Sequence, residues 1–163
     1  MSLDPTDDRT LTLRREYPEP IGAVWAALTE SDRLASWIGT YTGSGRPGGT
    51  VEFTMTGEVD AGGEVAPPAT VTVVECAAPG TAGGEGATAR LVVDIPESAE
   101  RTWRIAITLR DEGGRTGLVF EQAVPVGLDP ADIEAGWRWY LDRLGAALQG
   151  GPMPAWADYA PAG

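Results

Sequence analysis

The chain has 163 residues, of which 24 are acidic and 12 are basic, so its formal net charge is −12. A chain this acidic repels phosphate backbones and anionic lipid surfaces, so we expect it to bind neither nucleic acid nor membranes. It has no histidine and no lysine. This excludes a Ser-His-Asp triad, a zinc site with histidine ligands, a lysine Schiff base and a Walker-type phosphate loop.

The length predicts one domain with its own core. We expect a flexible N-terminus at residues 1–9, the folded domain at 10–149 and an irregular tail at 150–163. No run approaches the roughly 18–20 apolar residues of a membrane-spanning helix, and the N-terminus is acidic where a signal peptide is basic. Together with the single cysteine, Cys76, which cannot form an internal disulfide, these features predict a cytoplasmic protein.

The first elements in chain order are a strand and two short helices. Residues 10–17 alternate in polarity and predict a strand. In "PIGAVWAALT" the apolar residues recur at helical spacing, and Pro20 suits the first position of a helix. A second short helix is predicted in "SDRLASWI", with Ser31 as its N-cap and Leu34, Trp37 and Ile38 on one face.

From residue 50 the polarity pattern changes to a period of two. It predicts strands at 50–56, 69–76, 89–95, 101–112 and 115–124, with a tight hairpin at "EGG" between the last two. Because apolar residues fall on one side of each strand and polar residues on the other, we expect an antiparallel sheet with one solvated face.

After Pro130 the helical period returns and predicts a long helix that ends at Gly150. Its apolar side chains fall within roughly 60° of one direction at 100° per residue, so this stripe packs against a large apolar surface. Trp139 points roughly 140° away from the stripe. Three environments for Trp139 stay open: cover by the tail around Trp156 and Tyr159, contact with a partner subunit, or exposure to solvent.

The order of these motifs resembles the START/Bet v 1-like superfamily, in particular its bacterial branch similar to the C-terminal domain of the Hsp90 ATPase activator. The stretches that carry the resemblance are "PIGAVWAALTESDRLASWI", "TVEFTM", "TVTVVECAAPG", "TWRIAITLRDEGGRTGLVFEQAV" and "GWRWYLDRLGAAL". The resemblance implies an α+β helix-grip fold, in which a curved antiparallel sheet of six or seven strands wraps around the long C-terminal helix.

The resemblance also implies a cavity between the sheet and that helix, which binds a small apolar or amphipathic molecule. We expect the cavity to be lined by Trp37, Phe53, Met55, Trp103, Phe120, Trp137, Tyr140, Leu141 and Leu144. Complete filling of the interior by these same side chains is the alternative, since ligand pockets are also mostly apolar. The hydroxyl of Tyr140 is the candidate polar contact with the ligand. No catalytic residue, metal ligand or cofactor is assigned.

Two other functions stay open. The first is an Hsp90-activator-like interaction module, which would present the face carrying Trp139 to a protein partner or to a second copy of the chain. The second is a cyclase or dehydratase that acts in the same cavity. Its candidate groups are Tyr140 and whichever of Glu52 and Glu121 is buried, because burial raises the pKa of a carboxyl group and makes it a general acid.

Overall fold

The computed structural model describes residues 9–43, 46–55, 69–79, 87–98, 101–124 and 130–152, together with Pro154 and Tyr159. Within these ranges seven strands form one antiparallel sheet in the order β1-β7-β6-β5-β4-β3-β2. The strands are β1 (Arg9–Tyr17), β2 (Gly39–Gly43), β3 (Thr50–Met55), β4 (Ala69–Ala77), β5 (Thr88–Ser98), β6 (Arg101–Asp111) and β7 (Thr116–Val124).

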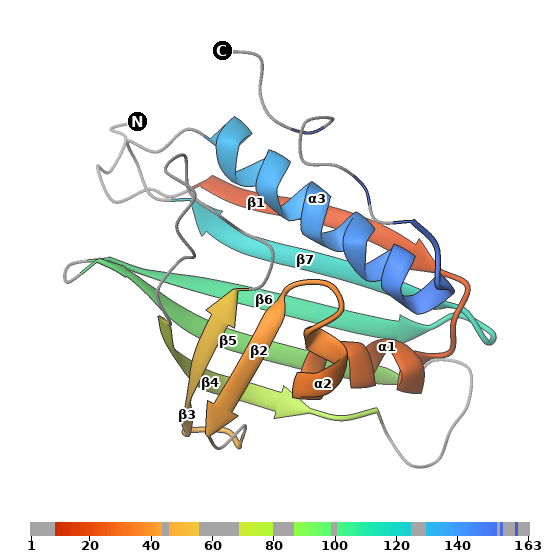
Figure 1. The fold of residues 1–163 in the computed structure, drawn as a ribbon, viewed down its shortest axis with the longest axis horizontal. Helices are drawn as coiled ribbons and strands as arrows, with labels where there is room; N and C mark the ends of the chain where they lie inside the picture. The colour runs from red at the N-terminus through yellow and green to blue at the C-terminus, as the bar shows by residue number, and fades with distance from the viewer. Residues whose placement is uncertain are drawn as a thin grey trace, which may run out of the picture.

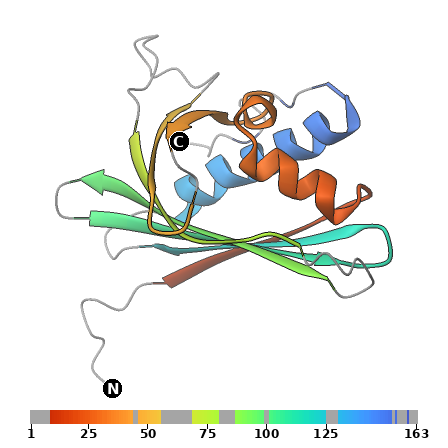
Figure 2. The same cartoon turned by 90° about the horizontal axis from the view of Figure 1, so that it is seen from below.

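Three helices accompany the sheet in the described ranges: α1 (Ile21–Thr29), α2 (Ser31–Leu34) and α3 (Pro130–Gln149). All three lie on the same side of the sheet, whose β2 and β3 end curls up toward them (Figure 2). The long helix α3 runs alongside β1 and β7, while α1 and α2 lie next to β2 (Figure 1). The predicted α+β helix-grip architecture is therefore confirmed. None of the helices in these ranges is long and apolar enough to cross a membrane.

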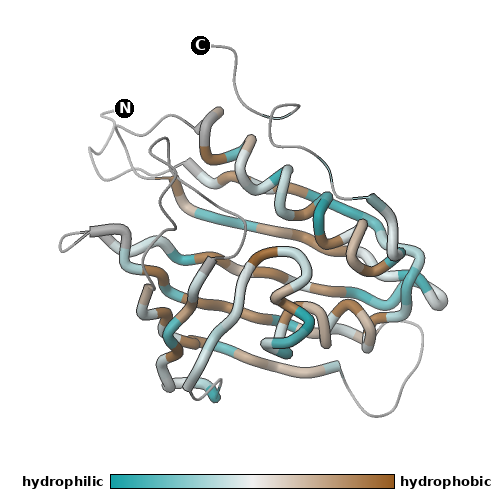
Figure 3. Tube along the Cα trace, viewed as in Figure 1, coloured by the Kyte–Doolittle hydropathy of each residue, from teal (hydrophilic) through white to brown (hydrophobic). Residues whose placement is uncertain are grey.

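The hydropathy pattern explains the arrangement. Apolar and polar residues are interspersed along the strands and along α3 (Figure 3), which is typical of elements that bury one face. On β7 buried residues recur at every second position from Thr116 to Val124. At the centre of the core, Leu109, Phe120, Leu141 and Leu144 are each 0% exposed.

Glycines form the β6–β7 turn and end α3, as predicted. The β6–β7 hairpin turns through Gly113 and Gly114, at φ of 77° and 92°, a conformation that favours glycine. Helix α3 ends where Gly150 takes a φ of 70° and the N–H of Gly151 donates to the carbonyl of Ala146 at 2.9 Å.

The second short helix departs from the prediction. It ends at Leu34, and Trp37 and Ile38 follow in a turn. Ser31 was expected to be its N-cap, but this was wrong: Ser31 is the first helical residue, and the cap position is Glu30, which makes no side-chain capping bond. The hydroxyl of Ser31 instead bonds both the N–H and the carbonyl of Tyr41, at 3.0 Å each, and so joins α2 to β2.

Strand β2 was not among the segments predicted from polarity alternation. It is five residues long, lies at the edge of the sheet and pairs only with β3 within the described residues. Tyr41 is its single large side chain, so "GTYTG" gives no alternation to detect. Gly39 is needed here, because a Cβ atom at this position would lie 2.3 Å from the carbonyl oxygen of Thr54 and 2.8 Å from the Phe53 ring.

Candidate ligand-binding cavity

A cavity with a volume of about 520 Å³ lies between the sheet and the N-terminal half of α3. The strands contribute Tyr41, Val51, Phe53, Ala69, Val71, Val73, Cys76, Leu91, Val93, Ile95, Trp103, Ile105 and Ile107. The helices and the turn after α2 contribute Leu28, Thr29, Leu34, Trp37, Ile38, Ile133, Gly136, Trp137 and Tyr140. Most of these side chains are hydrocarbon or aromatic, so the wall is strongly apolar.

Strand pairing places the aliphatic side chains opposite one another. Leu91, Val93 and Ile95 of β5 lie directly across from Ile107, Ile105 and Trp103 of β6. Alternate residues of a strand share a face, so these three pairs form a continuous apolar surface. On β4 a register shift between Val73 and Glu75 lets Cys76 join Val71 and Val73 at the same wall.

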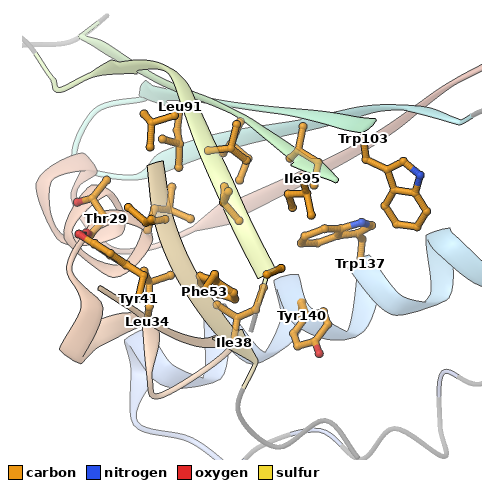
Figure 4. Close-up of a pocket in the computed structure, with 18 of the residues that line it drawn as sticks. Thr29, Leu34, Ile38, Tyr41, Phe53, Leu91, Ile95, Trp103, Trp137 and Tyr140 are labelled. Carbon is orange, nitrogen blue, oxygen red and sulfur yellow. The ribbon is translucent and has the colours of Figure 1, made fainter. Parts of the chain in front are cut away.

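The ring of Tyr41 closes one end of the cavity. Its hydroxyl donates to the carbonyl of Thr29 at the end of α1. Together with the Ser31 bonds to its backbone, this fixes β2 against the two short helices. The polar atoms of Tyr41 are therefore bonded to the protein, and its ring faces the cavity (Figure 4).

Trp37 is held equally firmly on the helical side. Its indole N–H donates to the carbonyl of Ala27 at 2.8 Å, and its own carbonyl accepts from Nε of Arg143 at 2.8 Å. The side chain is 2% exposed. This network uses the polar groups of Trp37 to join α1, the following turn and α3.

The part of the cavity wall formed by the described residues carries no charged side chain. No Asp, Glu or Arg is among the cavity-lining residues of the described chain. Burial raises the pKa of the Cys76 thiol above its ordinary value, so the thiol stays protonated near neutral pH. A bound molecule would therefore meet no charged side chain among these described residues.

The structure brings five of the nine predicted cavity residues to the wall: Trp37, Phe53, Trp103, Trp137 and Tyr140. Phe120, Leu141 and Leu144 are instead fully buried in the packed core and do not line the cavity. The reason is that α3 lies directly on β7 and β1: the Phe120 and Trp137 rings are 4.5 Å apart, and the Tyr17 hydroxyl donates to the Leu141 carbonyl. Met55 ends β3, and its side chain lies outside the described residues.

Sequence reasoning missed the aliphatic wall on β4, β5 and β6, as well as Tyr41. The period-two pattern places Val71 and Val73 on one face of β4, and it places Leu91, Val93 and Ile95 on one face of β5. An apolar strand face is typical of a packed core as well as of a cavity wall, so this pattern alone does not distinguish the two.

Trp139 is covered by the tail, one of the three environments left open. It is 8% exposed, and its indole N–H donates to the carbonyl of Pro154 at 2.9 Å. The guanidinium carbon of Arg143 lies 4.8 Å from the centre of its ring. The face of α3 that carries Trp139 therefore presents no exposed ring to a protein partner.

The carboxylates considered for a cyclase do not face the cavity. Glu52 is exposed and accepts a hydrogen bond from Thr70 at 2.7 Å. Glu121 lies on β7 between the inward-facing Phe120 and Gln122, so its side chain points to the opposite face of the sheet. Among the described residues, no group of three or more Cys, Asp or Glu side chains is placed to hold a metal ion.

Comparison with known proteins identifies the family. The family model described as "Activator of Hsp90 ATPase homolog 1-like protein" matches residues 19–149. The chain belongs to this family. The family match and the structural neighbours together place the chain in the Bet v 1-like superfamily. A comparison with curated protein sequences found no match.

Several solved structures share the fold. The crystal structure of CalU16 from Micromonospora echinospora is 24% identical, with a TM-score of 0.69 over 93% of this chain and 81% of CalU16. The solution structure of the BPP1335 protein from Bordetella parapertussis is 21% identical, with a TM-score of 0.72 and the same coverage, 93% and 81%. DynU16, a protein in the dynemicin biosynthetic locus, is 20% identical, with a TM-score of 0.70 over 91% of this chain and 51% of DynU16.

Proposed function

We propose that this member of the Activator of Hsp90 ATPase homolog 1-like family binds a small apolar molecule in the cavity between its sheet and α3. The observation that carries the proposal is the cavity itself, about 520 Å³ in volume with an uncharged, apolar wall. This volume lies within the roughly 300–1,000 Å³ of ligand pockets. Protein interiors otherwise hold few voids larger than a water molecule, so packing alone does not account for the space.

We assign the ligand contacts to two kinds of side chain. The rings of Trp37, Phe53, Trp103, Trp137 and Tyr140 offer broad apolar faces. The aliphatic residues of β4, β5 and β6 complete the surface. Because the shape is set by backbone pairing within the sheet, the site is largely preformed. The occurrence of the neighbour DynU16 in a biosynthetic locus agrees with a small organic ligand for this fold.

Titration with an uncharged fluorescent probe, N-phenyl-naphthylamine, tests the proposal. Val93→Trp fills the cavity from β5, where Val93 is part of the wall. The matched control is Val74→Trp, because Val74 lies on β4 but is 37% exposed and outside the cavity.

We expect saturable one-site binding to the wild type and to Val74→Trp, and at least tenfold weaker binding to Val93→Trp. Circular dichroism must show that both variants keep the fold. Equal binding by all three proteins would place the probe outside the cavity, and absence of binding by the wild type would contradict the proposal.

A further inference from the structure

One residue of the cavity wall has no side chain. Gly136 lies inside the helix α3 and lines the cavity. Glycine is among the least favourable residues in a helix interior, because it loses the most conformational freedom when the chain folds. A glycine at this position therefore needs a reason.

The two usual structural reasons for a glycine do not apply to Gly136. It has a helical backbone and is not one of the glycines with a positive φ. Outside its own chain neighbours and helix backbone, a Cβ atom built on it would meet no atom of the described residues within 4 Å. Gly145 of the same helix differs, because a Cβ atom there would lie 3.2 Å from the Tyr17 ring. Packing accounts for the glycine at 145 and not for the one at 136.

Gly136 stands in the middle of the face of α3 that lines the cavity. That face consists of Ile133, Gly136, Trp137 and Tyr140, whose spacings of three, four and seven place them on one side of a helix. The missing side chain leaves an open space beside Gly136, between Ile133 and Tyr140, which we call the notch. Because Gly136 is part of the wall, a molecule in the cavity can reach the helix backbone there.

The two rings next to the notch are held in place by other contacts. The Trp137 ring lies 4.5 Å from that of Phe120, and the Tyr140 ring lies 5.0 Å from that of Trp139. Figure 4 shows Trp137 and Tyr140 beside each other on α3, with their rings 5.9 Å apart. The contacts with Phe120 and Trp139 keep these rings from moving into the notch, so the space stays available to a ligand.

We propose that Gly136 sets how large a molecule the cavity accepts, because the ligand extends into the notch and packs against the backbone of α3. This inference rests on the proposed function, since it concerns the ligand of the same cavity. Protein interiors are close-packed, so a side chain placed in the notch displaces an equal volume of ligand. The glycine lowers the stability of the helix and leaves that room for the ligand.

A series of straight-chain 1-alkanols tests the inference, because affinity rises with each added methylene group until the cavity is filled. Calorimetry gives the cutoff, which is the chain length at which affinity stops rising. The variants are Gly136→Ala and Gly136→Leu. The matched controls are Gly22→Ala and Gly22→Leu, because Gly22 lies in α1, is exposed and is outside the cavity wall. A Cβ atom at Gly22 also meets no described atom within 4 Å.

We expect the wild type and both Gly22 variants to share one cutoff. In Gly136→Leu the cutoff falls by about four carbons, the size of the new side chain, and in Gly136→Ala it falls by about one. Alkanols shorter than the new cutoff keep their wild-type affinity. Without ligand, Gly136→Ala unfolds at a temperature about 2–4 °C above that of the wild type, because alanine favours the helix.

A second measurement does not depend on any variant. In the wild-type complex with the longest alkanol below the cutoff, nuclear Overhauser effects should connect the Hα protons of Gly136 with the alkanol chain. Their absence overturns the inference.

The other outcomes separate the two proposals. An unchanged cutoff in folded Gly136→Leu, or an equal loss of affinity at every chain length, overturns the role of Gly136 in size selection. A lower unfolding temperature of Gly136→Ala overturns it too, because packing would then account for the glycine. If the wild type binds N-phenyl-naphthylamine but no alkanol, only this inference fails. If it binds neither, the proposed function fails as well.

Discussion

The indole N–H of Trp139 donates a hydrogen bond to the carbonyl oxygen of Pro154, at 2.9 Å, and so attaches the segment after α3 to the outer side of that helix. The same segment supplies Tyr159, whose hydroxyl donates to Asp142 at 2.7 Å. The ring of Trp139 lies 5.0 Å from that of Tyr140, which lines the cavity. Pro154 and Tyr159 are thus part of the packing that supports the cavity wall.

Trp139→Phe removes the donor to Pro154 and weakens the contact with Arg143, so we expect it to lower the free energy of unfolding by about 1 kcal/mol. Urea denaturation measures the change. Trp25→Phe is the comparison, because it removes the same atoms from a partly buried ring of α1. If Trp139→Phe costs no more than Trp25→Phe, the hydrogen bond to the tail contributes nothing to stability.

Gln122→Met is expected to stabilise the protein by about 1–3 kcal/mol, because it replaces a buried amide that has no hydrogen-bond partner among the described residues by an apolar side chain of similar length. Thermal and urea unfolding measure the effect. Gln149→Met at the exposed end of α3 is the control and should change little. A loss of stability in Gln122→Met would mean that the amide is bonded in solution.

Because of Tyr17, the free energy of unfolding depends on pH in the alkaline range. Burial raises the pKa of its phenol above the ordinary value of 10.0, so the folded protein keeps a proton that the unfolded chain loses. Its contribution is complete below about pH 10 and declines as the pH rises further. We therefore expect the wild type to lose about 1.4 kcal/mol more than Tyr17→Phe between pH 9 and pH 11.

The comparison of these two proteins isolates the phenol from all other titrating groups. At neutral pH, Tyr17→Phe should itself be destabilised by about 1 kcal/mol, because the buried bond to the Leu141 carbonyl is lost. Parallel stability curves for the two proteins up to pH 11 would contradict the burial of the phenol.

Cys76 reports occupancy of the cavity, because it is the chain's one cysteine and part of the wall. We expect saturating N-phenyl-naphthylamine to slow its alkylation by iodoacetamide at least fivefold in the wild type and in Val74→Trp. Mass spectrometry follows the rate, and protein unfolded in urea shows that the probe does not quench the reagent. An unchanged rate with bound probe would place the probe away from β4.

Much of the fold could be predicted because its patterns are local. The β6–β7 hairpin follows from alternation and two adjacent glycines, and α3 follows from its apolar stripe and Gly150. Strand β2 was not predictable in this way, since its position depends on pairing with β3 and on the bonds between Ser31 and Tyr41. Those contacts depend on the tertiary fold and leave no periodic signal.

The cavity was predictable only in part. A helical wheel placed Trp137 and Leu144 on one stripe, and both do face the sheet. A helical wheel gives the direction of each side chain around the helix axis, but not how α3 crosses the strands. That crossing brings Trp137 to the cavity and Leu144 into the packed core. Whether apolar side chains enclose space or fill it depends on this geometry, so composition alone did not distinguish the two.

The most direct measurement is a crystal structure of the protein grown with N-phenyl-naphthylamine. The proposed function predicts density for one molecule between the sheet and α3, in contact with Phe53 and Trp137. A cavity closed by the side chains of its own wall, with the compound absent or bound only at the surface, would contradict it.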